Sequence, residues 1–246
     1  NTKYLLTNSK LICSDNTQNY KDQIKQAIFD NGSVFASYHH ENNCYSNGTY
    51  YKSKNMVNLD HAVSIVGWDD NFDKTKFKIH PENNGAWLIK NSWGAGFGNA
   101  GYFWMSYDEG SLGYVYSFDF TKNDHLGIYQ YDGTQNPLCS SYITYTNIAD
   151  VYKVTKDKEN LTAVSIGSKS IGVSYKLNIY TNLQNPNDPL SGTPEIAQEE
   201  IIQNVGMNYV QLNKEISLQN GTYYAIVIEP QYGKQLNIFA DQTNTE

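Results

Sequence analysis

Short apolar runs separated by turn residues dominate this 246-residue sequence, and one stretch has the spacing of an amphipathic helix. In that stretch, NYKDQIKQAIFDNG (19–32), Ile24, Ala27 and Ile28 share one face and Asn-Gly ends the helix. The runs HAVSIVGW (61–68) and GAWLIKNSW (85–93) are apolar, strand-sized and bounded by polar loops, which predicts two buried strands. The fold class is therefore predicted to be mainly β, with α+β character overall.

The two halves of the chain differ in their patterns. In the first half, SVFASY (33–38) and GYFWMSY (101–107) predict further strands, and Asn47-Gly48 predicts a hairpin turn. After Gly113, alternating strands follow one another between Asn, Asp, Gly and Pro turns, as in LTAVSIGS, SYKLNIYTN and GTYYAIVIEP. Strands at this spacing with no helical periodicity between them predict an antiparallel β-sandwich. We expect one domain over residues 1–115, a linker over 116–127 and a sandwich over 128–246.

Charge excludes one class of partner. The sequence contains no Arg; residues 1–115 carry 10 Lys and 11 acidic residues, and the rest of the chain carries 8 Lys and 14 acidic residues. Phosphate backbones need clustered positive charge, so a nucleic-acid partner is not expected. The long apolar runs are all strand-sized, so no transmembrane segment is expected.

Three residues of the two buried strands could act together. A lone His in an apolar strand is more often a core or edge residue than a catalyst, and the same caution applies to Asn91 and Trp93 taken singly. An imidazole that acts as general base needs a partner that fixes its tautomer, and an Asn oxygen can accept the ring N–H. A Trp two residues beyond that Asn can cover the hydrogen bond. His61, Asn91 and Trp93 are therefore candidate site residues.

These residues lie in motifs that resemble the papain family of cysteine peptidases. DHAVSIVGW resembles the family's His segment, and WLIKNSWGAGFGNAGYFWMS resembles its Asn segment. The resemblance covers about residues 19–108 and implies the β-rich half of a papain-like fold. It implies that His61 is the general base, that Asn91 orients it and that Trp93 shields the pair. It also implies that Ser37, Asp60 and Ala62 line part of the substrate pocket.

The nucleophile of such a site is expected to lie outside this sequence. The family's Cys precedes the His and Asn by about 130–150 residues, but only 60 residues precede His61. Cys13, Cys44 and Cys139 all lack the expected flanking residues and position. We therefore expect that the chain begins inside the peptidase domain and is inactive alone. A missing N-terminal half that carries the Cys would then be its partner, with a protein or peptide as substrate.

The second half resembles the lectin-like domain of some bacterial secreted and surface members of this family, on segments such as YKLNIYTN and LNKEISLQNGTYYAIVIEP. This implies contact with cell-wall carbohydrate, an extracellular or cell-surface location, and calcium as a conceivable ion. No metal site is predicted, because DDNFD (69–73) lacks the later ligands of a calcium loop. His39 and His40 are interpreted as a surface pair.

Two functions from different classes remain. The first is peptide-bond hydrolysis through a Cys-His-Asn site whose Cys lies outside the chain. The second is a non-catalytic fragment that binds carbohydrate or a cell surface, with the peptidase remnant as a scaffold. The presence or absence of a companion polypeptide that carries a reactive Cys would discriminate between them.

Overall fold

The computed structural model describes residues 4–12, 18–52, 58–122, 127–130 and 142–239. The chain divides into two compact units. The first unit is Lys10–Asp119, and the second unit is Phe120–Glu246 together with Asn1–Ser9. Two long strands, β1 (Tyr4–Ile12) and β8 (Gly113–Lys122), contribute residues to both units.

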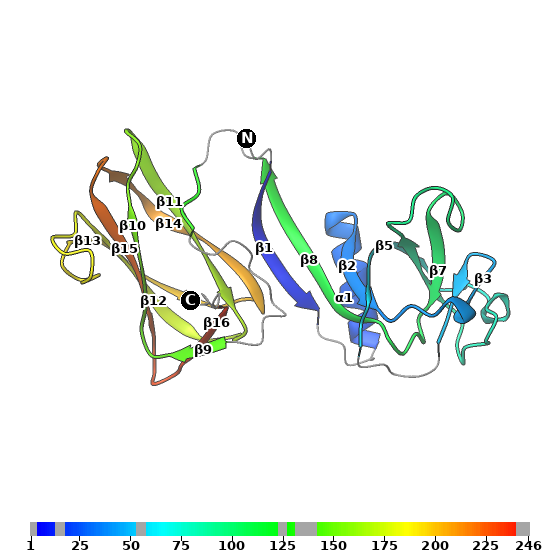
Figure 1. Ribbon diagram of the computed structural model, residues 1–246. Coiled ribbons are helices and arrows are strands. Elements are labelled where there is room, and N and C mark those ends of the chain that lie inside the picture. Colours follow the sequence, from blue (N-terminus) through cyan, green and yellow to red (C-terminus); the bar gives the residue numbers. More distant parts are fainter. Residues whose placement is uncertain (1–3, 13–17, 53–57, 123–126, 131–141, 240–246) are drawn as a thin grey trace, which may run out of the picture. The chain divides into compact units, whose positions relative to one another are not determined.

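The sheet of the first unit contains eight strands in the order β1-β8-β2-β5-β6-β7-β4-β3 (Figure 1). Its remaining strands are β2 (Val34–Tyr38), β3 (Tyr45–Ser46), β4 (Thr49–Tyr50), β5 (His61–Asp69), β6 (Ala86–Lys90) and β7 (Tyr102–Ser106). The central neighbours β2, β5, β6 and β7 pair antiparallel, whereas β4 pairs with β7 in parallel. The β3–β4 hairpin turns at Asn47 and Gly48, which both have positive φ, as a tight two-residue turn requires.

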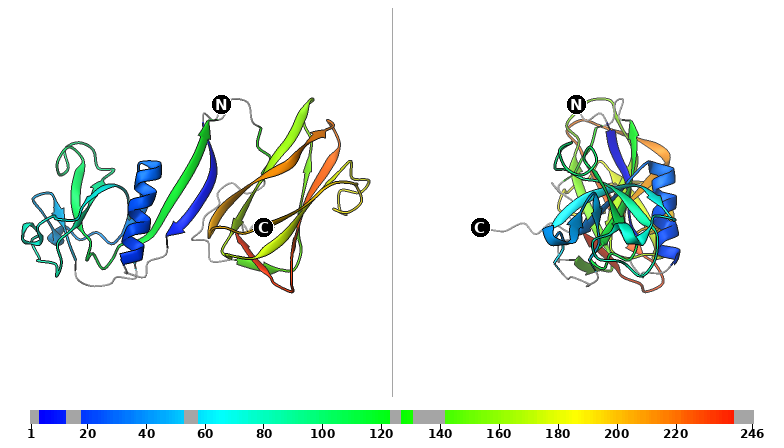
Figure 2. Two further views of the ribbon diagram at one scale, coloured as in Figure 1. Left: turned by 180° about the vertical axis from the view of Figure 1, so that it is seen from behind. Right: turned by 90° about the vertical axis from the view of Figure 1, so that its right-hand side faces the viewer.

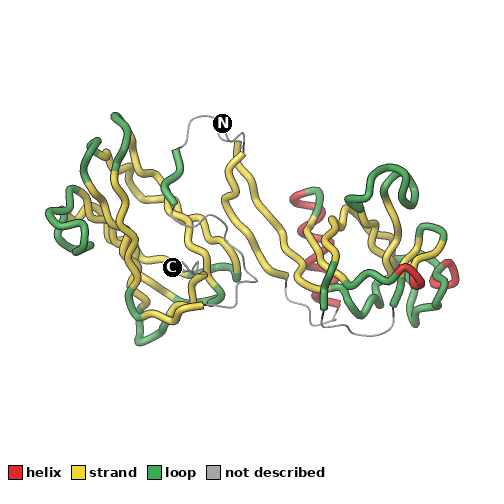
Figure 3. Tube along the Cα trace, in the orientation of Figure 1, coloured by secondary structure: helices red, strands yellow, loops and turns green. Residues whose placement is uncertain are grey.

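One α-helix and two short 3-10 helices accompany this sheet (Figure 3). The helix α1 (Gln18–Asn31) buries Ile24 and Ile28, and it ends where the Gly32 N–H donates to the Ile28 carbonyl at a φ of +81°. The 3-10 helices are η1 (Asn42–Cys44) and η2 (Lys74–Lys76). None of the helices among the described residues is long and apolar enough to cross a membrane.

The core of the first unit follows from the alternation along its strands. In β2 every second residue, namely Val34, Ala36 and Tyr38, is buried, and β5 places Val63 and Ile65 on the same side. Trp87 of β6 and Phe103 of β7 complete the interior. The sheet register thereby determines which side chains meet at the ends of β5 and β6.

The second unit is a sandwich of two four-stranded sheets, which Figure 2 shows from two further directions. One sheet contains β10 (Ile148–Lys153), β15 (Tyr223–Pro230), β12 (Ser174–Thr181) and β13 (Thr193–Ile201) in that order. The other contains β14 (Gly206–Leu218), β11 (Glu159–Ser168), β16 (Leu236–Phe239) and β9 (Tyr142–Tyr145). Aliphatic side chains of both sheets, such as Leu177 and Val210, form one core.

The predicted fold class is confirmed: the chain is mainly β, and an antiparallel sandwich follows a β-rich unit with one α-helix. One interval differs in detail from the expectation. Most of the expected linker 116–127 is strand, because β8 continues to Lys122 between its sheet neighbours β1 and β2. Residues 123–126 of that interval lie outside the described residues.

Candidate active site

Two neighbouring strands bring His61 and Asn91 together. His61 is the first residue of β5, and Asn91 directly follows β6. These strands pair antiparallel, with Ser64 opposite Lys90, so the start of β5 lies beside the end of β6. The His61 Nε2 atom is 2.8 Å from the Asn91 Oδ1 atom.

The hydrogen bonds around Asn91 determine which imidazole nitrogen carries the proton. The Ser92 backbone N–H donates to Asn91 Oδ1 at 2.8 Å, so the oxygen of the amide, and not its NH₂ group, must occupy this position. An oxygen can only accept, so His61 donates from Nε2 and keeps a lone pair on Nδ1. The neutral ring is therefore arranged to accept a proton at Nδ1.

The Asn91 amide has an unusual environment for a structural residue. It is 8% exposed, and its Nδ2 group is buried without an acceptor among the described residues. A buried donor without a partner costs about 1–3 kcal/mol. Polar groups retained at such a cost are typical of functional sites. The Asn91 oxygen thus has two partners, the Ser92 N–H and His61, while its NH₂ group has none among the described residues.

Trp93 covers the pair. Its ring stacks on His61 with a centroid distance of 4.6 Å and an interplanar angle of 28°. Phe97 meets Trp93 edge-on at 4.9 Å and 90°. Trp93 is itself 46% exposed, so the indole lies between one face of the His61 ring and solvent, next to the partly buried His61–Asn91 hydrogen bond. A glycine shapes this loop: Gly98 has a φ of +56°, and a Cβ there would lie 2.2 Å from the Tyr102 carbonyl oxygen.

The three expected pocket residues lie near the start of β5. Ser37 of β2 is directly opposite Ala62 in the register, and its hydroxyl donates to the Gly113 carbonyl at 2.9 Å. Ala62 is exposed. The Asp60 carboxylate accepts the His40 backbone N–H at 2.9 Å, and this hydrogen bond lowers the Asp60 pKa. The structure therefore brings Ser37 and Ala62 together, while their role toward a substrate stays a prediction.

A buried aromatic side chain, Tyr38, packs against the His61 imidazole. Tyr38 has no exposed surface, and its ring meets His61 at 5.5 Å and 65°. The Tyr38 hydroxyl lies 2.8 Å from His40 Nδ1, and burial raises the Tyr38 pKa far above its ordinary value. The interpretation of His39 and His40 as a surface pair is wrong for both residues: His40 is half-buried among these rings, and the His39 side chain is 19% exposed.

One sequence signal could have identified His40. The buried residues of β2 occupy even positions, and His40 continues that alternation two residues beyond Tyr38. Read past the end of the strand, the same period places His40 toward the interior. His39 lies at the alternate position, where its Nδ1 is 2.9 Å from Asp60 Oδ2.

The described cysteine is a poor nucleophile. Cys44 is buried, and its thiol lies 3.3 Å from Asn43 Oδ1 and 3.8 Å from Glu41 Oε2. Burial raises the pKa of this thiol, with a further contribution from the Glu41 carboxylate. Reactive cysteines need a lowered pKa, so Cys44 stays a protonated thiol. Cys13 and Cys139 lie outside the described residues.

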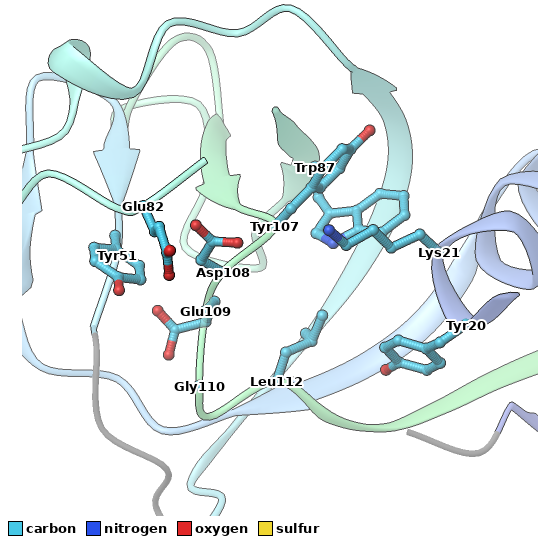
Figure 4. Close-up of a pocket in the computed structure, with 10 residues that line it drawn as sticks. All are labelled: Tyr20, Lys21, Tyr51, Glu82, Trp87, Tyr107, Asp108, Glu109, Gly110 and Leu112. Carbon is cyan, nitrogen blue, oxygen red and sulfur yellow. The ribbon is translucent and has the colours of Figure 1, made fainter. Parts of the chain in front are cut away.

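A separate cavity of about 280 Å³ opens elsewhere in the first unit (Figure 4). Aromatic rings and carboxyl groups face it together, among them Tyr51, Trp87, Tyr107, Glu82, Asp108 and Glu109. It shares no lining residue with the His61 site. Among the described residues, no group of three or more His, Cys, Asp or Glu side chains has an arrangement that would hold a metal ion.

Two protein families match this chain, and the boundary between the two matches lies close to the boundary between the two structural units. Residues 3–118 match the family described as papain family cysteine protease, and residues 128–245 match the lectin-like domain family. A cathepsin L-like protein of Caenorhabditis elegans is 32% identical over 92 residues, or 36% of this chain. Cathepsin S of Bos taurus is 31% identical over 94 residues, or 37% of this chain. The chain spans about a quarter of the length of each of these curated relatives.

A solved structure extends the similarity to the whole chain. The clostridial cysteine protease Cwp84 after propeptide cleavage is 26% identical with a TM-score of 0.78, over 100% of this chain and 62% of that one. A second structure contains the cysteine protease and lectin-like domains of Cwp84, a surface layer associated protein of Clostridium difficile. It matches the fold with a TM-score of 0.71 and 24% identity, over 100% of this chain and 55% of that one. Both resemblances noted in the sequence are thereby confirmed.

Proposed function

Because this chain carries a papain-family cysteine protease region followed by a lectin-like domain, we propose that it supplies the base and the orienting amide of a cysteine peptidase. One observation carries the proposal: the 2.8 Å contact between His61 Nε2 and Asn91 Oδ1, with the amide held by the Ser92 N–H. This contact leaves Nδ1 of His61 as the proton acceptor. Asn91 orients the ring and fixes its tautomer without adding charge, and this leaves the imidazole ready to act as a general base.

The proposed reaction is hydrolysis of a peptide bond in two stages. Nδ1 of His61 takes the proton of a cysteine thiol, and the thiolate attacks the peptide carbonyl carbon. The C–N bond breaks as the imidazolium returns its proton to the leaving amine, which leaves a thioester. Water then attacks the thioester while Nδ1 accepts its proton, and the departing thiolate takes that proton back. The products are an amine, a carboxylic acid and the original thiol.

We place the nucleophile outside residues 1–246. The buried Cys44 thiol has a raised pKa and hydrogen-bond partners of its own, so it does not form the thiolate that the reaction needs. Cys13 and Cys139 lie 48 residues before and 78 residues after His61, in contrast to the separation of about 130–150 residues that is typical of the family. The chain would therefore act together with a polypeptide segment that carries the Cys.

A second candidate function has its own support. The lectin-like match over residues 128–245 favours binding of carbohydrate at a cell surface, and the similar protein Cwp84 is surface-layer associated. Under this alternative the first unit is a scaffold without catalysis. An extracellular or cell-surface location is proposed under both functions.

A thiol-reactive peptide electrophile separates the two functions. It is applied to the protein isolated with any companion polypeptide retained, and also to the 246-residue chain alone. We expect covalent labelling of a Cys outside residues 1–246, no labelling of the chain alone, and labelling about 10²-fold slower in His61→Ala. The exposed His80→Ala is the matched control and should label at the normal rate.

Two outcomes would overturn the peptidase proposal. One is rapid labelling of Cys44 in the isolated chain, which would identify a different nucleophile. The other is labelling that does not change in His61→Ala, which would remove the imidazole from the reaction. An absence of labelling in both samples, together with retention on a carbohydrate column, would favour the binding function.

A further inference from the structure

His40 contacts the candidate site, although it lies outside the two motifs that contain His61 and Asn91. Its ring meets Trp93 at a centroid distance of 4.8 Å and an angle of 88°, and it lies 6.2 Å from the His61 ring. His61 and Trp93 are stacked at 4.6 Å. A ring on the opposite face of the indole would lie much farther than 6.2 Å from His61. His40 therefore borders the edge of Trp93, beside the face that covers His61.

The His40 ring is held on several sides. Its Nδ1 lies 2.8 Å from the Tyr38 hydroxyl, and its Nε2 lies 3.1 Å from Asn42 Oδ1. One face stacks on Tyr50 at 5.4 Å and 22°. The backbone N–H of His40 donates to Asp60 Oδ1, next to His61 in the sequence. Tyr38 and Tyr50 have no exposed surface, so His40 is fixed to the interior of the unit.

Trp93 is fixed less firmly than His40. It lies in the irregular segment between β6 and β7 and is 46% exposed. Its ring contacts are the face against His61 and the perpendicular rings of His40 and Phe97. An exposed indole without lateral contacts can adopt other rotamers. The two lateral rings therefore restrict the indole to one orientation.

The geometry points to His40 as a positioning residue that holds the Trp93 indole over the His61–Asn91 hydrogen bond. The inference rests on the proposed function only where it concerns catalysis, because the contacts among His40, Trp93 and His61 are present whether or not the protein is a peptidase. His40 acts through Trp93 and does not exchange protons with a substrate. It thereby extends the site to a residue outside the His and Asn motifs.

Hydrogen bonding supports a neutral His40 in this role. The oxygen Asn42 Oδ1 can only accept, so His40 donates to it from Nε2, and Nδ1 of the neutral ring then accepts the hydrogen bond of the Tyr38 hydroxyl. Burial lowers the pKa of His40, and the nearby His61 and His39 act in the same direction. Asp60 and the Asn42 hydrogen bond act in the opposite direction.

The test follows the ring Nε2–H of His61 by ¹⁵N NMR in the 246-residue chain, which requires no nucleophile. In His40→Ala we expect this proton to exchange with solvent about 3- to 10-fold faster, the factor that corresponds to the loss of one aromatic edge contact. His40→Phe combined with Tyr38→Phe keeps the ring and removes the hydroxyl with its partner, so exchange should return to within about twofold of the wild type. His80→Ala is the matched histidine control and should leave exchange unchanged.

Unchanged exchange in His40→Ala, or failure of the double Phe variant to restore it while its melting temperature stays normal, would overturn the inference. Thermal melts of each variant separate loss of the fold from loss of the local contact. The electrophile experiment above tests the peptidase function independently. Faster exchange in His40→Ala without His61-dependent labelling would retain the positioning role of His40 and reject the peptidase function. Unchanged exchange together with His61-dependent labelling would retain the peptidase function and reject the positioning role.

Discussion

The two units fill their interiors with different chemistry. Rings such as Tyr38, Tyr50, Trp87 and Phe103 form much of the buried core of the first unit, whereas Ile, Leu and Val dominate that of the second. Among the described residues, the buried charged side chains, Lys52 and Glu109, both belong to the first unit. Aliphatic side chains pack well in many orientations once the strand register is set. Aromatic ring contacts and hydrogen bonds, in contrast, depend on the orientation of each side chain. The unit with directional groups in its interior is the one that carries the candidate site.

The largest expected effect tests whether the two cores are separate. Ile65 of the first core and Ile179 of the second are both fully buried. Replacing either with Ala should lower the free energy of unfolding by roughly 2–5 kcal/mol, because each change leaves a cavity. Hydrogen exchange should show reduced protection mainly in the unit that carries the substitution.

Exposed isoleucines provide the controls for this pair. Ile79 in the first unit and Ile201 in the second are 43% and 48% exposed, so their Ala variants should differ from the wild type by less than about 0.5 kcal/mol. Equal loss of protection in both units from either core substitution would contradict separate cores.

The next effect compares one buried polar side chain in each unit. Glu109 accepts the Lys52 N–H and both the N–H and the hydroxyl of Ser111. Asn208 accepts the N–H groups of Gln203 and Asn204. Glu109→Ala should cost about 3 kcal/mol and Asn208→Ala about 2 kcal/mol in unfolding free energy, because each leaves buried donors unpaired.

Chemical denaturation measures both values. An equal or larger loss in Asn208→Ala would show that the buried polar groups of the first unit are no more important to stability than those of the second. The expected difference arises because hydrogen bonds to a charged acceptor are the stronger ones.

The third effect separates orientation from stability by means of two buried amides. Asn91 is 8% exposed and Gln198 is 9% exposed, and each amide oxygen accepts a backbone N–H. In the protein with its nucleophile, Asn91→Ala should lower kcat/KM about 10²-fold, because a misplaced base loses about that factor. Gln198→Ala should instead lower unfolding free energy by about 1 kcal/mol and leave kcat/KM unchanged. Peptide hydrolysis and melting, measured on both variants, check the pair; equal kinetic losses would refute the distinction.

The smallest effect concerns surface ion pairs. Asp70 pairs with Lys25 in the first unit, and Glu195 pairs with Lys214 at 3.1 Å in the second. Because each pair includes one side chain that is more than half exposed and therefore screened by solvent, Asp70→Asn and Glu195→Gln should each cost less than about 1 kcal/mol. High salt should reduce both contributions.

The pH dependence of stability gives a second test of the Asp70–Lys25 pair. The Lys25 hydrogen bond lowers the Asp70 pKa, and the Tyr107 hydroxyl adds to this effect. Since the folded pKa lies below the unfolded one, the contribution is present above the ordinary Asp pKa and disappears as pH falls through the lowered value. The stabilities of wild type and Asp70→Asn should therefore converge in strong acid, and a constant difference would contradict the pairing.

Local signals in the sequence were sufficient for much of the fold. The helix at 19–32 corresponds to α1, and Asn47-Gly48 forms the expected turn because both positions need positive φ. The strand β8 was less evident, since its partner β2 lies about 80 residues earlier and pairing at that distance leaves no local pattern. The strand β13 contains Pro194, which is tolerated because this strand forms the edge of its sheet.

The same division holds for the candidate site. His61, Asn91 and Trp93 lie in linked motifs, so their sequence context identified them. His40 lies in a polar run beside His39, and its direction depends on whether the alternation of β2 continues past Tyr38. Its contact with Trp93 depends on the path of the glycine-shaped loop after β6, which no strand period predicts.

The position of His61 at the first residue of β5, and of Asn91 just beyond β6, has a consequence for folding. The two side chains are 30 residues apart, and they meet only when β5 and β6 have paired. The imidazole tautomer that the Asn91 oxygen selects is therefore a property of the closed sheet and not of either strand alone.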